Sequence, residues 1–178
     1  CALPISQVIK NTLLRLQPGA ELAGADLAAY RSYYRLDFSA RYPGIDHRFS
    51  MVDFKDYRLA VQRFIQPEPR GTLLLVHGYF DHVGLYGHLV EYGLSRGLNV
   101  IAFDLPGHGL STGEPAVIAE FDDYTRAIAT CRSEYDSSLP GPWYCIAQST
   151  GGSAVMQLIL GSQPHYFHSV ALLAPLVR

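Results

Sequence analysis

The sequence predicts an α/β fold with a mostly parallel sheet, because short apolar runs alternate with helical patterns from Gly71 onward. The runs are typical of strands buried on both faces and occupy residues 72–76, 100–103, 143–147 and 170–174. Apolar side chains at helical spacing lie between the runs: Leu85, Leu89, Tyr92; Phe121, Tyr124, Ile128, Cys131, Tyr135; and Val155, Leu158, Ile159. Strands that alternate with helices indicate parallel pairing through right-handed crossovers.

Length and composition agree with a single globular domain. The chain has 178 residues, of which 48% are hydrophobic and 17% charged, so it is too apolar to remain disordered. The net charge of −2 and the lack of a cationic run argue against a nucleic-acid partner. The longest uncharged apolar stretch, residues 170–177, has eight residues and contains a proline, which is too short for a membrane span.

The first part of the chain predicts two helices followed by a hairpin. Residues 5–16 and 26–34 have helical patterns, and we expect the first of these helices to dock on the body rather than lie at an interface. After a turn at Pro43-Gly44, residues 51–54 and 57–64 alternate as two half-exposed strands joined at Lys55-Asp56. We therefore divide the chain into a helical extension, residues 1–44, and a core domain, residues 45–178.

Three cysteines without a CxxC spacing indicate neither a disulfide framework nor a zinc site. Cys131 and Cys145 fall in apolar patterns, so we expect both to be buried, reduced thiols. Cys1 stands where a start methionine is usual, and we expect a cut or processed chain, with a lipoprotein N-terminus as the alternative. The compartment stays open between the cytoplasm and a membrane periphery.

The strongest chemical signal is the sequence AQSTGG at residues 147–152, where a strand ends and a helix begins. Ser149 there lies at the carboxyl edge of the sheet, and the small residues Ala147 and Gly151 permit a sharp turn that exposes its hydroxyl. The free N–H groups of the following helix favour a developing oxyanion. The alternative is a helix-capping serine with glycines that serve packing.

Two further motifs follow the first two buried runs. The first of them, HGYFDH at residues 77–82, is either part of an active site or a glycine turn whose histidines have no functional role. A metal site at His77, Asp81, His82 and His88 is the rival interpretation, but this spacing fits no compact zinc pattern, so we expect no metal. The glycine-rich loop at residues 104–113 lacks a phosphate-binding lysine and predicts a structural turn beneath the site.

Together, HGYFDH, FDLPGHGLSTG (103–113) and AQSTGG resemble the α/β-hydrolase superfamily over residues 45–178. The most similar branch is that of the monoglyceride lipases and lysophospholipases, which is grouped with serine-aminopeptidase-like hydrolases. The resemblance implies that Ser149 is the nucleophile and that the N–H groups of Tyr79 and Thr150 form the oxyanion hole. It also implies supporting roles for His77, Gly78, Gln148 and Gly151. Two positions depart from the pattern: Ala147 replaces a glycine, and Asp81 stands where glutamate is common.

The resemblance also implies an acid and a histidine after the nucleophile, in that order. The residues after Ser149 contain His165 and His168 but no acid, since the last one is Asp136. Asp104 and His108 could replace the missing acid and histidine only from loops that precede the nucleophile in the chain. We therefore expect a truncated chain without the lid and the C-terminal strands, and we expect this chain alone to be inactive.

The expected function is hydrolysis of a lipid carboxylic ester, of the monoacylglycerol or lysophospholipid type, without a cofactor. Two alternatives stay open: a serine aminopeptidase of the same fold, and a non-catalytic short form that binds a lipid or a partner through an exposed sheet edge. Peripheral contact with a membrane, through the missing lid or the N-terminal helix, is a further expectation.

Overall fold

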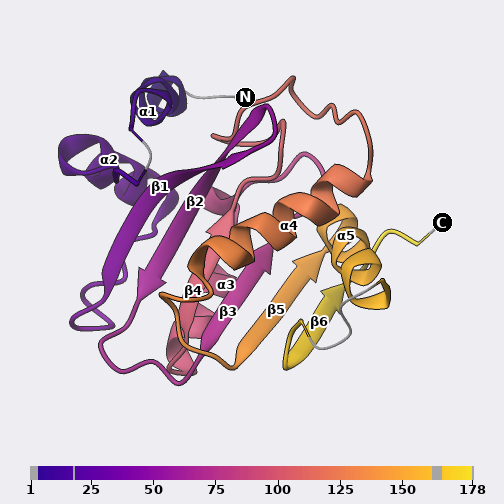
Figure 1. Ribbon diagram of the computed structural model, residues 1–178. Coiled ribbons are helices and arrows are strands. Elements are labelled where there is room, and N and C mark those ends of the chain that lie inside the picture. The colour runs from indigo at the N-terminus through magenta and orange to yellow at the C-terminus, as the bar shows by residue number, and fades with distance from the viewer. Residues whose placement is uncertain (1–3, 18, 162–165, 178) are drawn as a thin grey trace.

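A computed structural model describes residues 4–17, 19–161 and 166–177; Cys1 and His165 lie outside these ranges. Within them, one sheet has the strand order β1-β2-β4-β3-β5-β6 (Figure 1). Its strands are β1 (Asp46–Phe54), β2 (Tyr57–Ile65), β3 (Thr72–Val76), β4 (Asn99–Phe103), β5 (Trp143–Gln148) and β6 (Ser169–Leu173). β2 pairs antiparallel with β1 and β4, whereas the other three pairs are parallel. The predicted α/β sheet and its antiparallel hairpin are confirmed.

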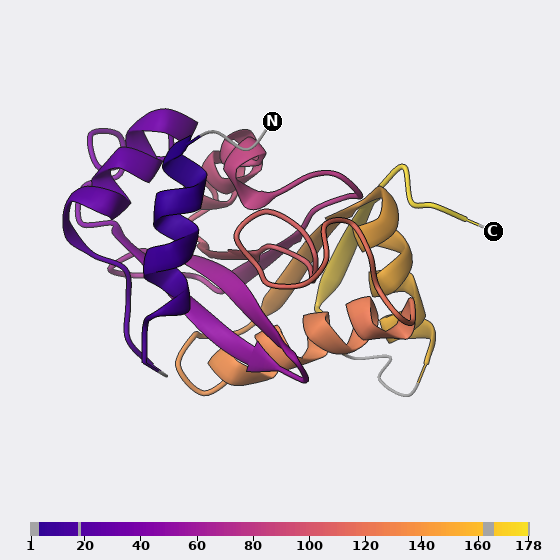
Figure 2. The ribbon, with the colours of Figure 1, turned by 90° about the horizontal axis from the view of Figure 1, so that it is seen from above.

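Helices cover the sheet on both faces (Figure 2). One face carries α1 (Pro4–Leu14), α2 (Gly24–Tyr34) and α3 (Gly87–Ser95), and the other carries α4 (Asp122–Tyr135) and α5 (Ser149–Leu160). α1 docks on the body as expected, because Ile9 and Leu13 are buried in the same apolar cluster as the side chains of α2 and α3. Arg58 of β2 donates from its guanidinium to the carbonyls of Leu14 and Leu16 at 2.8 and 3.1 Å, which holds the end of α1.

Burial of the strands differs from the expectation at both ends of the sheet. The hairpin is not half-exposed: the stretch from Leu59 to Phe64 is buried on both faces, because α2 and α4 flank it. β6 shows the opposite deviation, since its residues alternate between exposed and half-buried. It lies at the edge of the sheet, and a groove of about 470 Å³ runs beside it, lined in part by Tyr144, Ile146 and Val170.

The sequence predicted the wrong buried side for the helix around residues 85–92. Leu85 and Tyr92 are exposed, and the buried side of α3 consists of Val90, Gly93 and Leu94. A 3-10 turn, Val83–Leu85, precedes α3 and shifts its register. Gly93 allows the close approach: a Cβ there would lie 2.5 Å from a methyl group of Val100 on β4.

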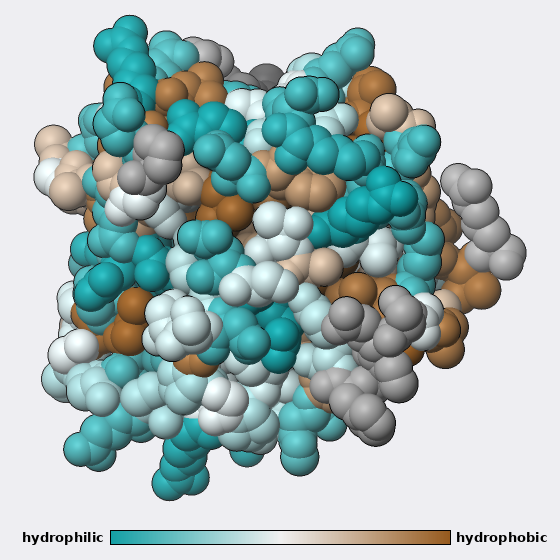
Figure 3. Space-filling view, in the orientation of Figure 1, coloured by the Kyte–Doolittle hydropathy of each residue, from teal (hydrophilic) through white to brown (hydrophobic). Residues whose placement is uncertain are grey.

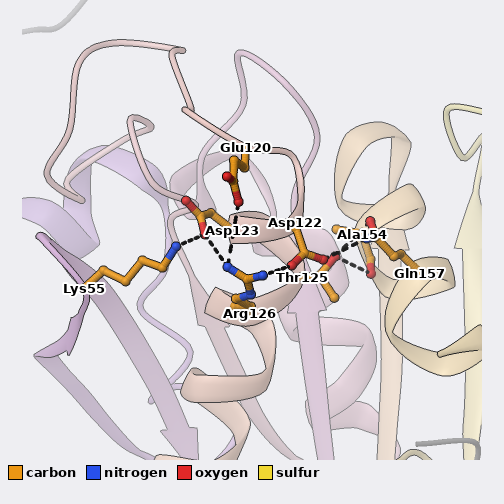
Figure 4. A network of polar contacts seen from close by, with 8 residues as sticks. All are labelled: Lys55, Glu120, Asp122, Asp123, Thr125, Arg126, Ala154 and Gln157. Atoms are coloured by element: carbon orange, nitrogen blue, oxygen red, sulfur yellow. Dashed lines mark hydrogen bonds and ion pairs between the residues drawn. The ribbon is translucent and has the colours of Figure 1, made fainter. Parts of the chain in front are cut away.

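α4 buries Tyr124, Ile128, Cys131 and Tyr135 of the predicted stripe, whereas Phe121 directly precedes the helix and is half-buried. Cys131 and Cys145 are buried and free, as expected. A polar network ties the start of α4 to the hairpin and to α5 (Figure 4). Lys55 in the hairpin turn forms an ion pair with the buried Asp123. Gln157 of α5 donates to Asp122 at 2.8 Å, and Arg126 pairs with the same carboxylate. These contacts orient α5, whose first residue is Ser149.

The surface in the view of Figure 3 is mainly hydrophilic, and apolar atoms gather on the side of α5 and β6. The exposed large apolar residues of that region are Leu160, Leu173, Leu176 and Val177. In the described part of the chain, no helix is long and apolar enough to cross a lipid bilayer.

Candidate active site

Ser149 lies in a strained turn between β5 and α5. Gln148 still has extended backbone angles, whereas Ser149 has a φ of 48°, a left-handed conformation that costs a non-glycine residue about 1–2 kcal/mol. The turn is tightly packed: a Cβ on Gly151 would lie 2.4 Å from the carbonyl oxygen of His77. A Cβ on Gly78 would lie 3.2 Å from the Cβ of Ser149. The loop after β3 therefore lies directly against the serine.

His77 fixes the orientation of the peptide unit that follows Gly78. Leu105 N–H donates to its Nε2 at 2.9 Å, so the other ring nitrogen carries the proton and Nδ1–H donates to the Gly78 carbonyl at 2.7 Å. Burial lowers the pKa of His77 to about 4, so the ring is neutral near pH 7. In a trans peptide, C=O and N–H point in opposite directions. The bond from His77 to the Gly78 carbonyl thus also sets the direction of the Tyr79 N–H.

Asp104, at the end of β4, holds two loops together beneath the site. Its side chain is buried, and its two oxygens accept hydrogen bonds from the N–H groups of Val83 and Leu110 at 2.8 and 2.7 Å. Gly109 lies so close that a Cβ there would be 2.2 Å from the carboxylate. These contacts support the structural role predicted for the glycine-rich loop.

Tyr86, a residue that no sequence pattern predicted to belong to the site, links the loop after β3 to the turn at Ser149. Its hydroxyl accepts from Gly78 N–H at 3.2 Å and donates to the side-chain oxygen of Gln148. Burial raises the pKa of Tyr86 above its usual value, so the hydroxyl keeps its proton. Tyr86 lies between Gly84 and Gly87 and belongs to no periodic pattern, so no local signal in the sequence points to its contacts.

A cavity of about 590 Å³ opens beside Ser149. It is mainly apolar and is lined by Tyr79, Ala116, Val117, Ile118, Phe121, Tyr124, Ser149, Thr150 and Leu176. Two of the lining residues are joined by a hydrogen bond, in which the Tyr79 hydroxyl donates to the Ala116 carbonyl at 2.6 Å. Leu176, another lining residue, donates from its N–H to the Ser149 carbonyl at 3.2 Å. A substrate of substantial apolar area can therefore contact the serine.

The residues considered as base or acid do not converge on Ser149. Among the described residues, no hydrogen bond joins Ser149 to a histidine. Both carboxylate oxygens of Asp104 are occupied by backbone amides, and Nδ1 of His108 lies 2.9 Å from the Pro106 carbonyl oxygen. His168 is exposed at the opposite end of β5 from the serine, where its N–H donates to Trp143.

In the described part of the chain, the side chains of the rival metal interpretation contact backbone groups and other side chains. Within the described ranges, no three His, Cys, Asp or Glu side chains are arranged to hold a metal ion. Both ring nitrogens of His77 are engaged with backbone groups. His82 Nδ1 accepts from Gly84 N–H at 3.2 Å, and Asp81 contacts Tyr86.

Comparison with solved structures places this arrangement in a known fold. An α/β-hydrolase fold protein from Burkholderia ambifaria superposes with a TM-score of 0.59 at 19% identity, covering 75% of this chain and 47% of that one. A monoacylglycerol lipase from Paleococcus ferrophilus has a TM-score of 0.57 at 31% identity, covering 66% and 43%. The protein thus has an α/β-hydrolase fold.

The chain belongs to the hydrolase family described as serine aminopeptidase, S33, whose profile matches residues 67–178. Human monoglyceride lipase is 31% identical over 110 residues, which are 61% of this chain and 36% of the human protein. The chain therefore spans well under half the length of the monoglyceride lipases that it matches. The resemblance predicted from the three motifs is confirmed at the level of family and fold.

Proposed function

We propose that this chain carries the nucleophile and the oxyanion hole of a serine hydrolase that cleaves carboxylic esters of lipids, such as monoacylglycerols or lysophospholipids. The observation that carries the proposal is the position of Ser149, in a left-handed turn at the start of α5 and packed against Gly78. The family match and the similarity to monoglyceride lipases support the same chemistry.

In the proposed reaction, Ser149 Oγ attacks the ester carbonyl carbon and loses its proton to a general base. The N–H groups of Tyr79 and Thr150 donate to the oxyanion, and the N-terminal end of α5 adds the positive end of its dipole. The tetrahedral intermediate collapses, the alcohol leaves with a proton, and an acyl group remains on Ser149. Water then attacks the acyl carbon and releases the fatty acid and the free serine.

The general base and its orienting acid would come from outside these 178 residues. The matched relatives extend well beyond the aligned part, and the residues after Ser149 contain no acid. We propose that the chain is the N-terminal portion of the complete enzyme and is inactive alone. A serine hydroxyl without a base is a poor nucleophile at neutral pH.

The cavity beside Ser149 supports an apolar substrate. The cavity lining includes Ile118, Phe121 and Tyr124. An acyl chain packed against these side chains would be removed from water, which would stabilise the bound substrate by about 0.8 kcal/mol for each buried methylene. Peripheral contact with a membrane belongs to this proposal, since such substrates reside in lipid phases.

Two other functions are compatible with the structure of this chain. An aminopeptidase acting on proline-terminated peptides would need the same nucleophile, and it agrees with the description of the family. A binding module would instead use the exposed strand β6 and the groove beside it. We favour the esterase because of the monoglyceride lipase relatives and the apolar cavity.

The test is hydrolysis by the longest protein that the coding sequence yields, with a monoacylglycerol, a lysophospholipid and a proline p-nitroanilide as substrates. We expect ester turnover that falls about 10⁶-fold in Ser149→Ala. Ser95→Ala is the matched control, because Ser95 is an exposed serine at the end of α3 that donates to the Tyr92 carbonyl. Turnover of the anilide alone would favour the aminopeptidase. Equal turnover by Ser149→Ala and the unmodified protein would contradict the assignment of the nucleophile.

A further inference from the structure

The Tyr86 hydroxyl is the only side-chain group in the described residues that hydrogen-bonds both to the loop after β3 and to the residue before Ser149. Tyr86 comes from the start of α3, so three separate segments of the chain meet at one oxygen atom. Its ring is buried, and the hydroxyl accepts one backbone proton and donates its own. This arrangement does not depend on the three motifs of the sequence.

The hydrogen bond from Gly78 N–H to Tyr86 is important because Gly78 is a flexible position in the loop after β3. Without a side chain, a glycine rotates freely about both backbone dihedrals, so the peptide units on its two sides can swing independently. The His77 ring holds the unit after Gly78 through its carbonyl, and the Tyr86 hydroxyl holds the unit before it through its N–H. With both units held, the Tyr79 N–H has one direction relative to Ser149.

We propose that Tyr86 is a positioning residue that links the loop after β3, which contains Gly78 and Tyr79, to the turn at Ser149 through Gln148, so that the Tyr79 N–H is aligned before substrate binds. This inference rests on the proposed function, because it assigns the role of Tyr86 to the same site. Pre-alignment matters because an oxyanion donor acts in the transition state and contributes most when it need not reorganise.

Asp81 offers a second acceptor for the same proton, since its carboxylate lies 3.1 Å from the Tyr86 hydroxyl. A phenol has a single proton and can donate it to one acceptor at a time. Tyr86 can link Gly78 to Gln148 only if Gln148 receives this proton. Substitutions at Gln148 and at Asp81 should therefore have different effects on Gly78.

The first test is hydrogen exchange of the Gly78 amide, measured by NMR on the 178-residue chain. Loss of one hydrogen bond corresponds to a change of about tenfold, which we expect in Tyr86→Phe. Gln148→Leu should also accelerate exchange of this amide, although the amide donates to Tyr86 and not to Gln148. Tyr92→Phe is the control, because Tyr92 lies on the exposed side of the same helix.

The double variant Tyr86→Phe/Gln148→Leu should exchange no faster than Tyr86→Phe alone, because both substitutions remove the same link. Asp81→Ala should leave the exchange unchanged. Acceleration in Asp81→Ala but not in Gln148→Leu would overturn the link to the serine turn. An unchanged rate in Tyr86→Phe would overturn the proposal altogether.

The second test is kinetic, on the longest protein that the coding sequence yields. Tyr86→Phe should lower kcat about tenfold and leave KM nearly unchanged, since the aligned N–H acts on the transition state. An equal kcat in Tyr86→Phe and the unmodified protein would overturn the positioning role. If instead Ser149→Ala turns over as fast as the unmodified protein, the proposed function fails, while hydrogen exchange still decides whether the link exists.

Discussion

Replacing Asp104 with alanine is expected to lower the free energy of unfolding by about 3 kcal/mol. The substitution leaves the N–H groups of Val83 and Leu110 buried without their acceptor. Each unsatisfied buried amide costs about 1–3 kcal/mol, and the two lie on loops that flank the site. Urea unfolding followed by circular dichroism measures the change.

Two further variants determine whether these hydrogen bonds are the cause. Asp104→Asn keeps an oxygen for one amide and presents an NH₂ group to the other, so we expect a smaller loss than for alanine. Asp53→Ala removes an exposed carboxylate that pairs with Arg58, and we expect a change below about 0.5 kcal/mol. Equal stability of Asp104→Ala and the unmodified chain would contradict the assigned role.

Gly151→Ala is expected to destabilise the chain by about 3 kcal/mol or more, even though alanine favours helices over glycine. The new methyl group would lie 2.4 Å from the carbonyl oxygen of His77 and 2.7 Å from a methyl group of Val76. The first of these contacts is with backbone, which cannot rotate away as a side chain can. The turn that carries Ser149 must therefore shift away from β3. Thermal and urea unfolding measure the loss of stability.

Gly87→Ala is the matched control, because Gly87 is also in the first turn of a helix. Its added methyl group would meet only the end of the Leu36 side chain, at 3.3 Å. We expect this variant to be as stable as the unmodified chain or slightly more stable. If Gly151→Ala were equally well tolerated, the tight packing of the serine turn against β3 would be disproved.

The sequence predicted the features that depend on local pattern and on residue type. Uninterrupted apolar runs located the parallel strands, and the stripe on α4 predicted its buried side. The Ala147–Gly152 segment located the turn at Ser149, because small residues are needed where backbones approach closely. In each case the signal lies within about fifteen consecutive residues.

The features that were missed depend on contacts between distant segments. The burial of β1 and β2 results from helices on both faces, and the exposure of β6 from its place at the edge of the sheet. The phase of α3 depends on a preceding 3-10 turn that periodicity does not reveal. The hydrogen bond from Tyr86 joins it to Gln148, 62 residues further along the chain. None of these relations leaves a periodic trace in the sequence.

The central claim is that Ser149 is the nucleophile, and covalent labelling with a fluorophosphonate tests it most directly. Intact mass and peptide mapping would be recorded for this chain and for the longest protein that the coding sequence yields. We predict one adduct, on Ser149, in the longer protein and none in this chain, because we propose that the general base lies outside these 178 residues. Absence of an adduct from both proteins, or an adduct on a different residue, would contradict the account.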